Sequence, residues 1–176
     1  ELSRNGRRSG LTFAPEGGSE RMRKVINKMV TEDDLIDTVA AAFGNGWRNV
    51  KLYFMCGLPT ETDEDVLAIA GMAARVIETG RKAAGTRDIR CTVSIGGFVP
   101  KPHTPFQWAA QASAETIDQR LFALRDAIRA DKHGFNPFLV GALFFWFDGD
   151  DIRFAGGTDF NDTARDKILV FVPILE

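Results

Sequence analysis

Apolar residues along the first three quarters of the chain follow two different periods. Nearly continuous apolar runs predict β-strands at positions 11–15, 50–56 and 90–95. Between and after these runs, apolar residues three and four positions apart predict amphipathic helices at 20–29, 32–43, 63–79 and 114–132. Strands that alternate with helices are typical of a parallel sheet, so the chain is predicted to have an α/β fold.

Polar residues mark where the predicted helices begin and end. Ser19 can cap the first helix, and Thr31 and Thr62 each have an aspartate three residues later, which is the spacing of a capping box. Gly80 follows the apolar stripe of the third helix and predicts that this helix ends there. Local chemistry therefore supports the boundaries that the periodicity predicts.

The three predicted strands all lead into segments rich in glycine and proline. These segments are 15–19, 57–62 and 96–106, and the run before the second one is apolar enough to predict a strand buried on both faces. In α/β folds, ligands bind at the carboxyl ends of the strands. We therefore expect the functional residues in these three segments.

The pattern changes after Lys132. Eight of the 14 phenylalanines lie in 133–176, and no helical periodicity occurs there. A strand is expected within 138–147, a hairpin turn at Asp148-Gly149 and further strands at 152–155 and 167–172. We predict a core domain at 1–132 and an atypical, short β-prone tail at 133–176 that is not native to the domain.

Composition narrows the classes of function. The chain has 176 residues and a net charge of −2, which argues against broad electrostatic capture of nucleic acid or anionic lipid, although a nucleic acid substrate stays open. The apolar run 138–147 is too short to span a bilayer, so no membrane partner is expected. No charged leader followed by an apolar segment opens the sequence at Glu1, so a cytoplasmic location is expected.

The cysteine content argues against a metal centre built by this chain. The two cysteines, Cys56 and Cys91, are 35 positions apart and each lies in a predicted strand. They cannot form a Cys-x-x-Cys site, and we expect them to be buried, reduced thiols. No metal site is predicted.

The three strand-end segments together resemble the radical S-adenosylmethionine superfamily over roughly 11–132. Segment 57–62, Gly-Leu-Pro-Thr-Glu-Thr, looks like the Gly-x-Pro-Gly-Glu-Thr element of methylthiotransferase-type enzymes, with Thr60 in place of the glycine. Segment 98–105, Phe-Val-Pro-Lys-Pro-His-Thr-Pro, is similar to the family's Tyr-Ser-Pro-Arg-Pro-Gly-Thr-Pro. Glu16 and Lys28, with Asn27 before it, match the Gln and Asn-Arg spacing of the oxygen-independent coproporphyrinogen dehydrogenase type.

This resemblance implies a partial (β/α) barrel, the second half of a radical S-adenosylmethionine TIM-like barrel. It is closest to uncharacterised bacterial members with a cobalamin-binding-like domain upstream. The family holds its [4Fe-4S] cluster with a Cys-x-x-x-Cys-x-x-Cys loop, which this sequence lacks. The expected partner is therefore the missing amino-terminal half of the barrel. The chain would be part of a radical S-adenosylmethionine iron-sulfur enzyme, one that uses 5′-deoxyadenosyl radical chemistry, and would be inactive alone.

The resemblance also implies roles in binding S-adenosylmethionine. Glu16 would accept hydrogen bonds from the ribose hydroxyls, and Lys28 would pair with the methionyl carboxylate. The adenine would lie against the backbone of six residues, Gly57, Leu58, Pro59, Phe98, Val99 and Pro100. No catalytic residue is assigned, because Glu61 is expected to serve the start of a helix and His103 to be exposed on its loop.

Two alternatives from other classes stay open. One is a different α/β-barrel enzyme, a lyase or hydrolase that uses Glu16, Glu61 and His103 as acid and base groups. The other is a non-catalytic truncated fragment, because three strands of an open barrel leave two unpaired edges.

Overall fold

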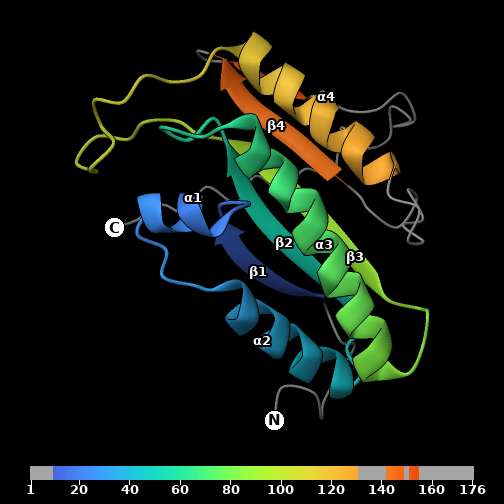
Figure 1. Cartoon of the computed structure of the whole chain (residues 1–176). Helices are drawn as coiled ribbons and strands as arrows, with labels where there is room; N and C mark the ends of the chain where they lie inside the picture. Colours follow the sequence, from blue (N-terminus) through green and yellow to red (C-terminus); the bar gives the residue numbers. More distant parts are fainter. Residues whose placement is uncertain (1–9, 131–141, 149–150, 155–176) are drawn as a thin grey trace.

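A computed structural model describes residues 10–130, 142–148 and 151–154. They form one sheet whose strands lie in sequence order (Figure 1). The strands are β1 (Leu11–Glu16), β2 (Asn49–Cys56), β3 (Arg90–Gly97), β4 (Ala142–Asp148) and β5 (Asp151–Phe154). Strands β1 to β4 are parallel neighbours, and β5 runs antiparallel to β4. The predicted α/β class and its three parallel strands are confirmed.

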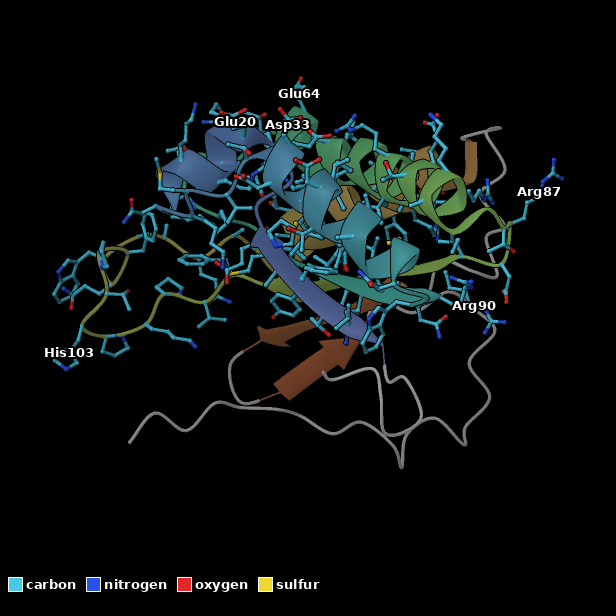
Figure 2. The ribbon with its side chains drawn as sticks, turned by 90° about the horizontal axis from the view of Figure 1, so that it is seen from below. Glu20, Asp33, Glu64, Arg87, Arg90 and His103 are labelled. Atoms are coloured by element: carbon cyan, nitrogen blue, oxygen red, sulfur yellow. The ribbon has the colours of Figure 1, made fainter. Side chains whose placement is uncertain are left out.

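Three long helices pack side by side on one face of this sheet. They are α2 (Glu32–Gly44), α3 (Asp63–Ala84) and α4 (Ala114–Ala130), and a short helix, α1 (Glu20–Val25), comes before them in the chain. Helix α3 contacts both α2 and α4, and Figure 2 shows α2 and α3 on the same side of the sheet. The predicted caps are present, with Ser19 capping α1 and complete capping boxes at Thr31 and Thr62. Capping of this kind contributes about 1 kcal/mol for each helix.

The main core lies between the helices and the sheet and is apolar. Phe43 from α2, Phe54 from β2 and Ile69 from α3 are completely buried there. The stripe predicted for α4 is also confirmed, because all four of its members are buried. These are Ile117, Leu121, Leu124 and Ile128.

Strand β2 alternates between two faces, so the prediction of a strand buried on both faces was wrong. Val50, Leu52, Phe54 and Cys56 are buried, while Lys51 is exposed and the residues that follow it on that face are half-buried. Alternate side chains of a strand point to opposite faces, and the helices cover only one of them. The opposite face of β2 therefore remains partly accessible.

Gly80 does not end α3, contrary to the prediction. The helix continues to Ala84 and ends at Gly85, whose φ of 63° is left-handed. A Cβ at Gly80 would lie 2.7 Å from the ring of Phe43. Gly80 thus permits close packing of α3 on α2 rather than a turn.

The first helix is shorter than its apolar spacing predicted. Helix α1 ends at Val25, and Asn27 has a left-handed φ of 58° that reverses the chain. Met29, expected on the buried stripe, is 73% exposed. The reversal brings the amide of Lys28 to the carbonyl of Arg23 at 2.7 Å.

Part of the predicted tail belongs to the sheet. Strand β4 pairs with β3 in parallel and β5 pairs with β4 antiparallel, so strands are confirmed within the expected ranges 138–147 and 152–155. Strand β4 includes Asp148, which was expected in the turn, and β5 begins one residue earlier than expected, at Asp151. Gly149 and Ala155 lie outside the described residues. The expected segments 138–141 and 167–172 lie outside the described residues. The division at residue 132 stays a prediction. Among the described helices, none is long and apolar enough to cross a bilayer.

Candidate functional site

The parallel order brings the carboxyl ends of β1, β2 and β3 to one end of the sheet. We call this end the mouth, formed by segments 15–19, 57–62 and 96–106. Figure 1 shows α1 and the loops after β2 and β3 gathered there. All the residues that the sequence assigned to a ligand lie at or beside the mouth, as the topology requires.

Glu16 and Lys28 lie close together beside β1. The Lys28 ammonium is 3.5 Å from a carboxylate oxygen of Glu16, and each side chain is 34% exposed. Tyr53, on the accessible face of β2, is half-buried, and burial together with the charge of Glu16 raises its pKa. The pair presents one anion and one cation to solvent at the same place, as a ligand with hydroxyl and carboxylate groups would need.

A cleft of about 450 Å³ opens next to this pair. It runs between β1 and α2, and its lining includes Phe13, Pro15, Lys28, Leu35 and Thr38. Since β1 is the first strand of the sheet, the cleft lies along an edge strand. Lys28 therefore belongs both to this cleft and to the pair with Glu16.

Arg23, which the sequence analysis missed, fixes the backbone around the Glu16–Lys28 pair. Its side chain is buried and donates to the carbonyls of Gly17 and Gly18 at 3.2 Å and of Val30 at 2.8 Å. Burial lowers the pKa of Arg23, and the three carbonyls compensate for its lost hydration. An arginine on a short polar helix gives no sequence signal of burial.

Two of the six residues assigned to adenine, Leu58 and Phe98, meet in a second apolar cluster. Leu58 and Phe98 are buried against Met22 of α1, and the Phe98 ring stands edge-on to Phe106 with centroids 6.0 Å apart. This cluster joins all three strand ends. Leu58 and Phe98 are buried as whole residues, and the Leu58 carbonyl and the Phe98 amide already bond to Glu61 and Cys56. The accessible part of these two segments lies at Pro59, Val99 and Pro100, which are half-buried.

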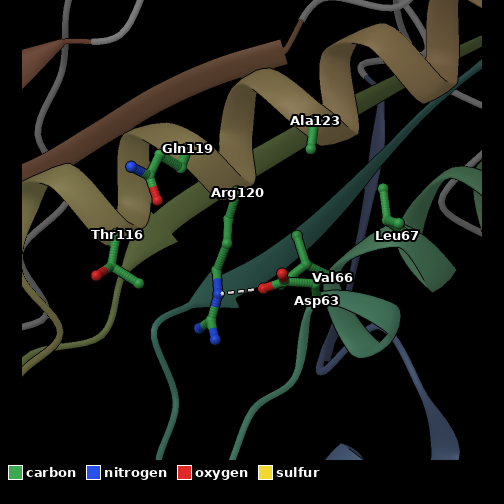
Figure 3. Close-up of a pocket in the computed structure, with 7 residues that line it drawn as sticks. All are labelled: Asp63, Val66, Leu67, Thr116, Gln119, Arg120 and Ala123. Atoms are coloured by element: carbon green, nitrogen blue, oxygen red, sulfur yellow. Dashed lines mark hydrogen bonds and ion pairs between the residues drawn. The ribbon is translucent and has the colours of Figure 1, made fainter.

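Glu61 is buried and fully engaged. Its carboxylate accepts from the Gly57 amide at 2.6 Å and from Arg120 Nη1 at 3.0 Å, and its side chain is 2% exposed. Arg120 also donates to Asp63 at 3.0 Å (Figure 3). Burial raises the pKa of Glu61, and the Gly57 amide and the Arg120 charge counter this effect.

Asp65 of α3 links the segment after β1 to the segment after β2 by hydrogen bonds. Its carboxylate accepts from Ser19 Oγ at 2.5 Å, from the Thr62 amide at 2.8 Å and from the Arg21 guanidinium. Arg21 also donates to the carbonyl of Thr60 at 2.8 Å. Burial opposes ionisation of Asp65, but these hydrogen bonds outweigh it and hold its pKa below the ordinary value. The sequence had assigned Asp65 only to a capping box.

Three non-glycine residues at the mouth have left-handed backbones: Glu16 at the end of β1, with a φ of 67°, and two residues of the loops after β2 and β3. Thr60 has a φ of 65° and His103 a φ of 62°. The side chain of His103 is exposed at its loop, as expected, and Figure 2 shows it pointing away from the rest of the chain. A β-branched residue rarely adopts this conformation, which favours glycine.

The two thiols do not fit an iron-sulfur cluster. Cys56 and Cys91 are both completely buried, and burial raises the pKa of each to about 12. Iron binds thiolates, so neither side chain is prepared as a ligand. Within the described residues, no three histidine, cysteine or acidic side chains form a group that could hold a metal ion.

Comparisons with known proteins give one relative that is itself uncharacterised. No known protein-family profile matches the chain, and no solved structure matches it. The chain is similar to the uncharacterised protein MJ0966 of Methanocaldococcus jannaschii, with 33% identity over 138 residues. The match covers 76% of this chain and 29% of the relative. The chain thus spans less than a third of the length of the curated relative it matches.

Proposed function

We propose that this chain is the second half of a radical S-adenosylmethionine (β/α) barrel and binds S-adenosylmethionine at its mouth. In the complete enzyme, the bound cofactor would supply 5′-deoxyadenosyl radical chemistry for hydrogen abstraction from a substrate. The residues described here would bind and orient the cofactor.

The observation that carries the proposal is the backbone of Thr60 and His103. Thr60 stands where the family element Gly-x-Pro-Gly-Glu-Thr has its second glycine, and His103 stands opposite the glycine of Tyr-Ser-Pro-Arg-Pro-Gly-Thr-Pro. Both have φ values in the region that favours glycine, 65° and 62°. The two loops therefore keep the shape that the family's glycines allow, although the glycines themselves are replaced.

Glu16 and Lys28 would bind the two polar ends of the cofactor. Glu16 directly ends β1, and its carboxylate can accept from two vicinal ribose hydroxyls. Lys28 would bind the methionyl carboxylate. Their mutual contact of 3.5 Å is long for an ion pair and one-third exposed, so it would yield to a ligand at small cost.

The backbone of Gly57–Pro59 and that of Phe98–Pro100 would line the adenine. Leu58 and Phe98 pack in the same apolar cluster, which sets the two segments next to each other. The Gly57 amide is taken by Glu61, so an adenine would meet the half-buried residues of the two segments, Pro59, Val99 and Pro100.

The cluster ligands would come from the missing amino-terminal half of the barrel. The two buried thiols of this chain do not fit that role, so the chain would be inactive alone. The engagement of Glu61 by Arg120 and Gly57 also argues against the lyase or hydrolase alternative, because a general acid or base must reach its substrate.

The proposal is tested by calorimetric titration of this chain with S-adenosylmethionine. Saturable binding is expected, and Glu16→Ala is expected to raise Kd about tenfold, because a hydrogen bond to a charged group contributes about 1.5–3 kcal/mol. The matched control is Glu20→Ala, which removes an exposed carboxylate paired with Lys24. Absence of binding by the wild-type chain, or equal affinities of Glu16→Ala and wild type, would overturn the proposal.

A further inference from the structure

A buried carboxylate connects two segments that are distant in sequence, the loop after β2 and helix α4. Glu61 lies in the loop after β2, accepts from the Gly57 amide at the end of that strand, and pairs with Arg120 of α4. Residues 61 and 120 are 59 positions apart. The side chain of Glu61 therefore links helix α4 to the end of β2.

The end of β2 has little freedom to adopt another conformation. Gly57 has a left-handed φ of 86°, and a Cβ at this position would lie 3.1 Å from Ala112 and 3.3 Å from Ile117. Its amide points to Glu61 rather than to solvent. Whatever fixes the Glu61 carboxylate therefore fixes the backbone at Gly57.

Arg120 bonds to the Glu61 carboxylate, to the Glu61 carbonyl and to Asp63 with three separate donors. Nη1 donates to Glu61 Oε2 at 3.0 Å, Nη2 donates to the Glu61 carbonyl at 2.9 Å, and Nε donates to Asp63 Oδ1 at 3.0 Å. The Arg120 side chain is only 16% exposed, and Figure 3 shows it extending from α4 toward the first turn of α3. A planar guanidinium can satisfy these acceptors together, whereas a lysine ammonium cannot match the same arrangement.

We propose that Arg120 is a positioning residue: through Glu61 it holds the Gly57–Pro59 backbone in the conformation that binds the adenine of S-adenosylmethionine. The part concerning adenine rests on the proposed function. Without Arg120, Glu61 would be a buried carboxylate with no cation beside it, and such a group is strongly disfavoured. The loop would rearrange to expose Glu61, and the Gly57 amide would lose its acceptor.

The test compares Arg120→Met, Glu61→Gln and the double variant by amide hydrogen exchange, read at Gly57 by NMR. In Arg120→Met, the protection factor of the Gly57 amide is expected to fall at least tenfold. In the double variant, it is expected to recover to the Glu61→Gln value, because a neutral amide oxygen can accept from Gly57 without a cation nearby. A residue that only packs would not be rescued in this way. Arg125→Met, which removes an arginine paired with its neighbour Asp126 on the same helix, is the control.

Wild type and the same four variants are titrated with S-adenosylmethionine. Kd is expected to rise about tenfold in Arg120→Met and to recover in the double variant. Unchanged Gly57 protection in Arg120→Met, or no recovery in the double variant, would overturn the role of Arg120. Unchanged Kd despite lost protection would overturn its link to adenine.

Two further outcomes are distinguishable. If the wild-type chain binds no S-adenosylmethionine, the proposed function fails, and the exchange data still decide whether Arg120 positions Gly57. If Arg120→Met does not fold, Arg120→Lys is used, which keeps the charge and loses the planar donors. Protection at Gly57 is then expected to fall, and full protection would overturn the inference.

Discussion

The core under the helices and the region at the mouth of the sheet both contain buried side chains, but these side chains differ in kind. Between the sheet and α2, α3 and α4, the buried cluster consists of apolar side chains such as Phe43 and Ile69. At the mouth, the charged side chains of Arg23, Glu61 and Asp65 are buried as well. Apolar packing is not directional, whereas buried charges require partners at fixed positions. The core thus stabilises the chain, and the mouth gives its loops a defined shape.

The largest effect is expected from a change in the core. Phe43→Ala should lower the free energy of unfolding by about 3–5 kcal/mol, because it removes a completely buried ring that packs on α3. Urea denaturation followed by circular dichroism measures this. Phe122→Ala, which shortens a phenylalanine that is 49% exposed on α4, is the control and should cost far less. Equal losses of unfolding free energy in Phe43→Ala and Phe122→Ala would contradict the prediction, because they would show that burial in the core does not determine the size of the effect.

A smaller effect, with a pH signature, is expected at the mouth. Asp65→Asn should lower the free energy of unfolding at pH 7 by about 2–3 kcal/mol, because the bonds from Arg21 and Ser19 lose a charged acceptor. The pKa of Asp65 is lowered in the folded chain, so its contribution is present above the unfolded value of 3.8 and is lost as pH falls below it.

The pH dependence is measured by urea denaturation from pH 7 to pH 2.5. The difference between wild type and Asp65→Asn should shrink as the solution becomes more acidic. Asp88→Asn removes a carboxylate that is 73% exposed and should leave the pH dependence nearly unchanged. If the difference in unfolding free energy between wild type and Asp65→Asn stayed constant at all pH values, the stabilising effect of Asp65 would not depend on the charge of its carboxylate.

The smallest expected effect is a gain in stability. Thr60→Gly should raise the free energy of unfolding by about 1 kcal/mol. A left-handed backbone costs a non-glycine residue about 1–2 kcal/mol, and glycine avoids this cost. Part of the gain is offset because glycine loses more backbone entropy on folding. Thermal unfolding measures the change. Thr104→Gly, in the loop after β3 and without a left-handed φ, should destabilise instead. A loss of stability in Thr60→Gly would show that the threonine side chain compensates for its backbone.

The sequence predicted the core better than the mouth, for a physical reason. Periodic apolar residues predicted β1 to β3 and the helices, and capping residues predicted where α2 and α3 begin. The roles of Arg23 and Arg120 could not be predicted, because each depends on partners that only the tertiary structure brings near. Gly80 was misread for the same reason, since the ring it accommodates belongs to another helix. The contact of Glu16 with Lys28 joins two residues that the sequence analysis had assigned to different groups of one ligand, without predicting that they touch each other.

The contact between Arg120 and Glu61 has a consequence for the evolution of such sheets. Strand–helix units of α/β proteins are often regarded as pieces that duplication and recombination can exchange. Here the unit formed by β2 and α3 depends on an arginine supplied by α4, the helix of the following unit. A transplanted β2–α3 unit would leave its buried carboxylate without a cation unless the next helix came with it. The smallest exchangeable segment of this chain is therefore a pair of consecutive units rather than one.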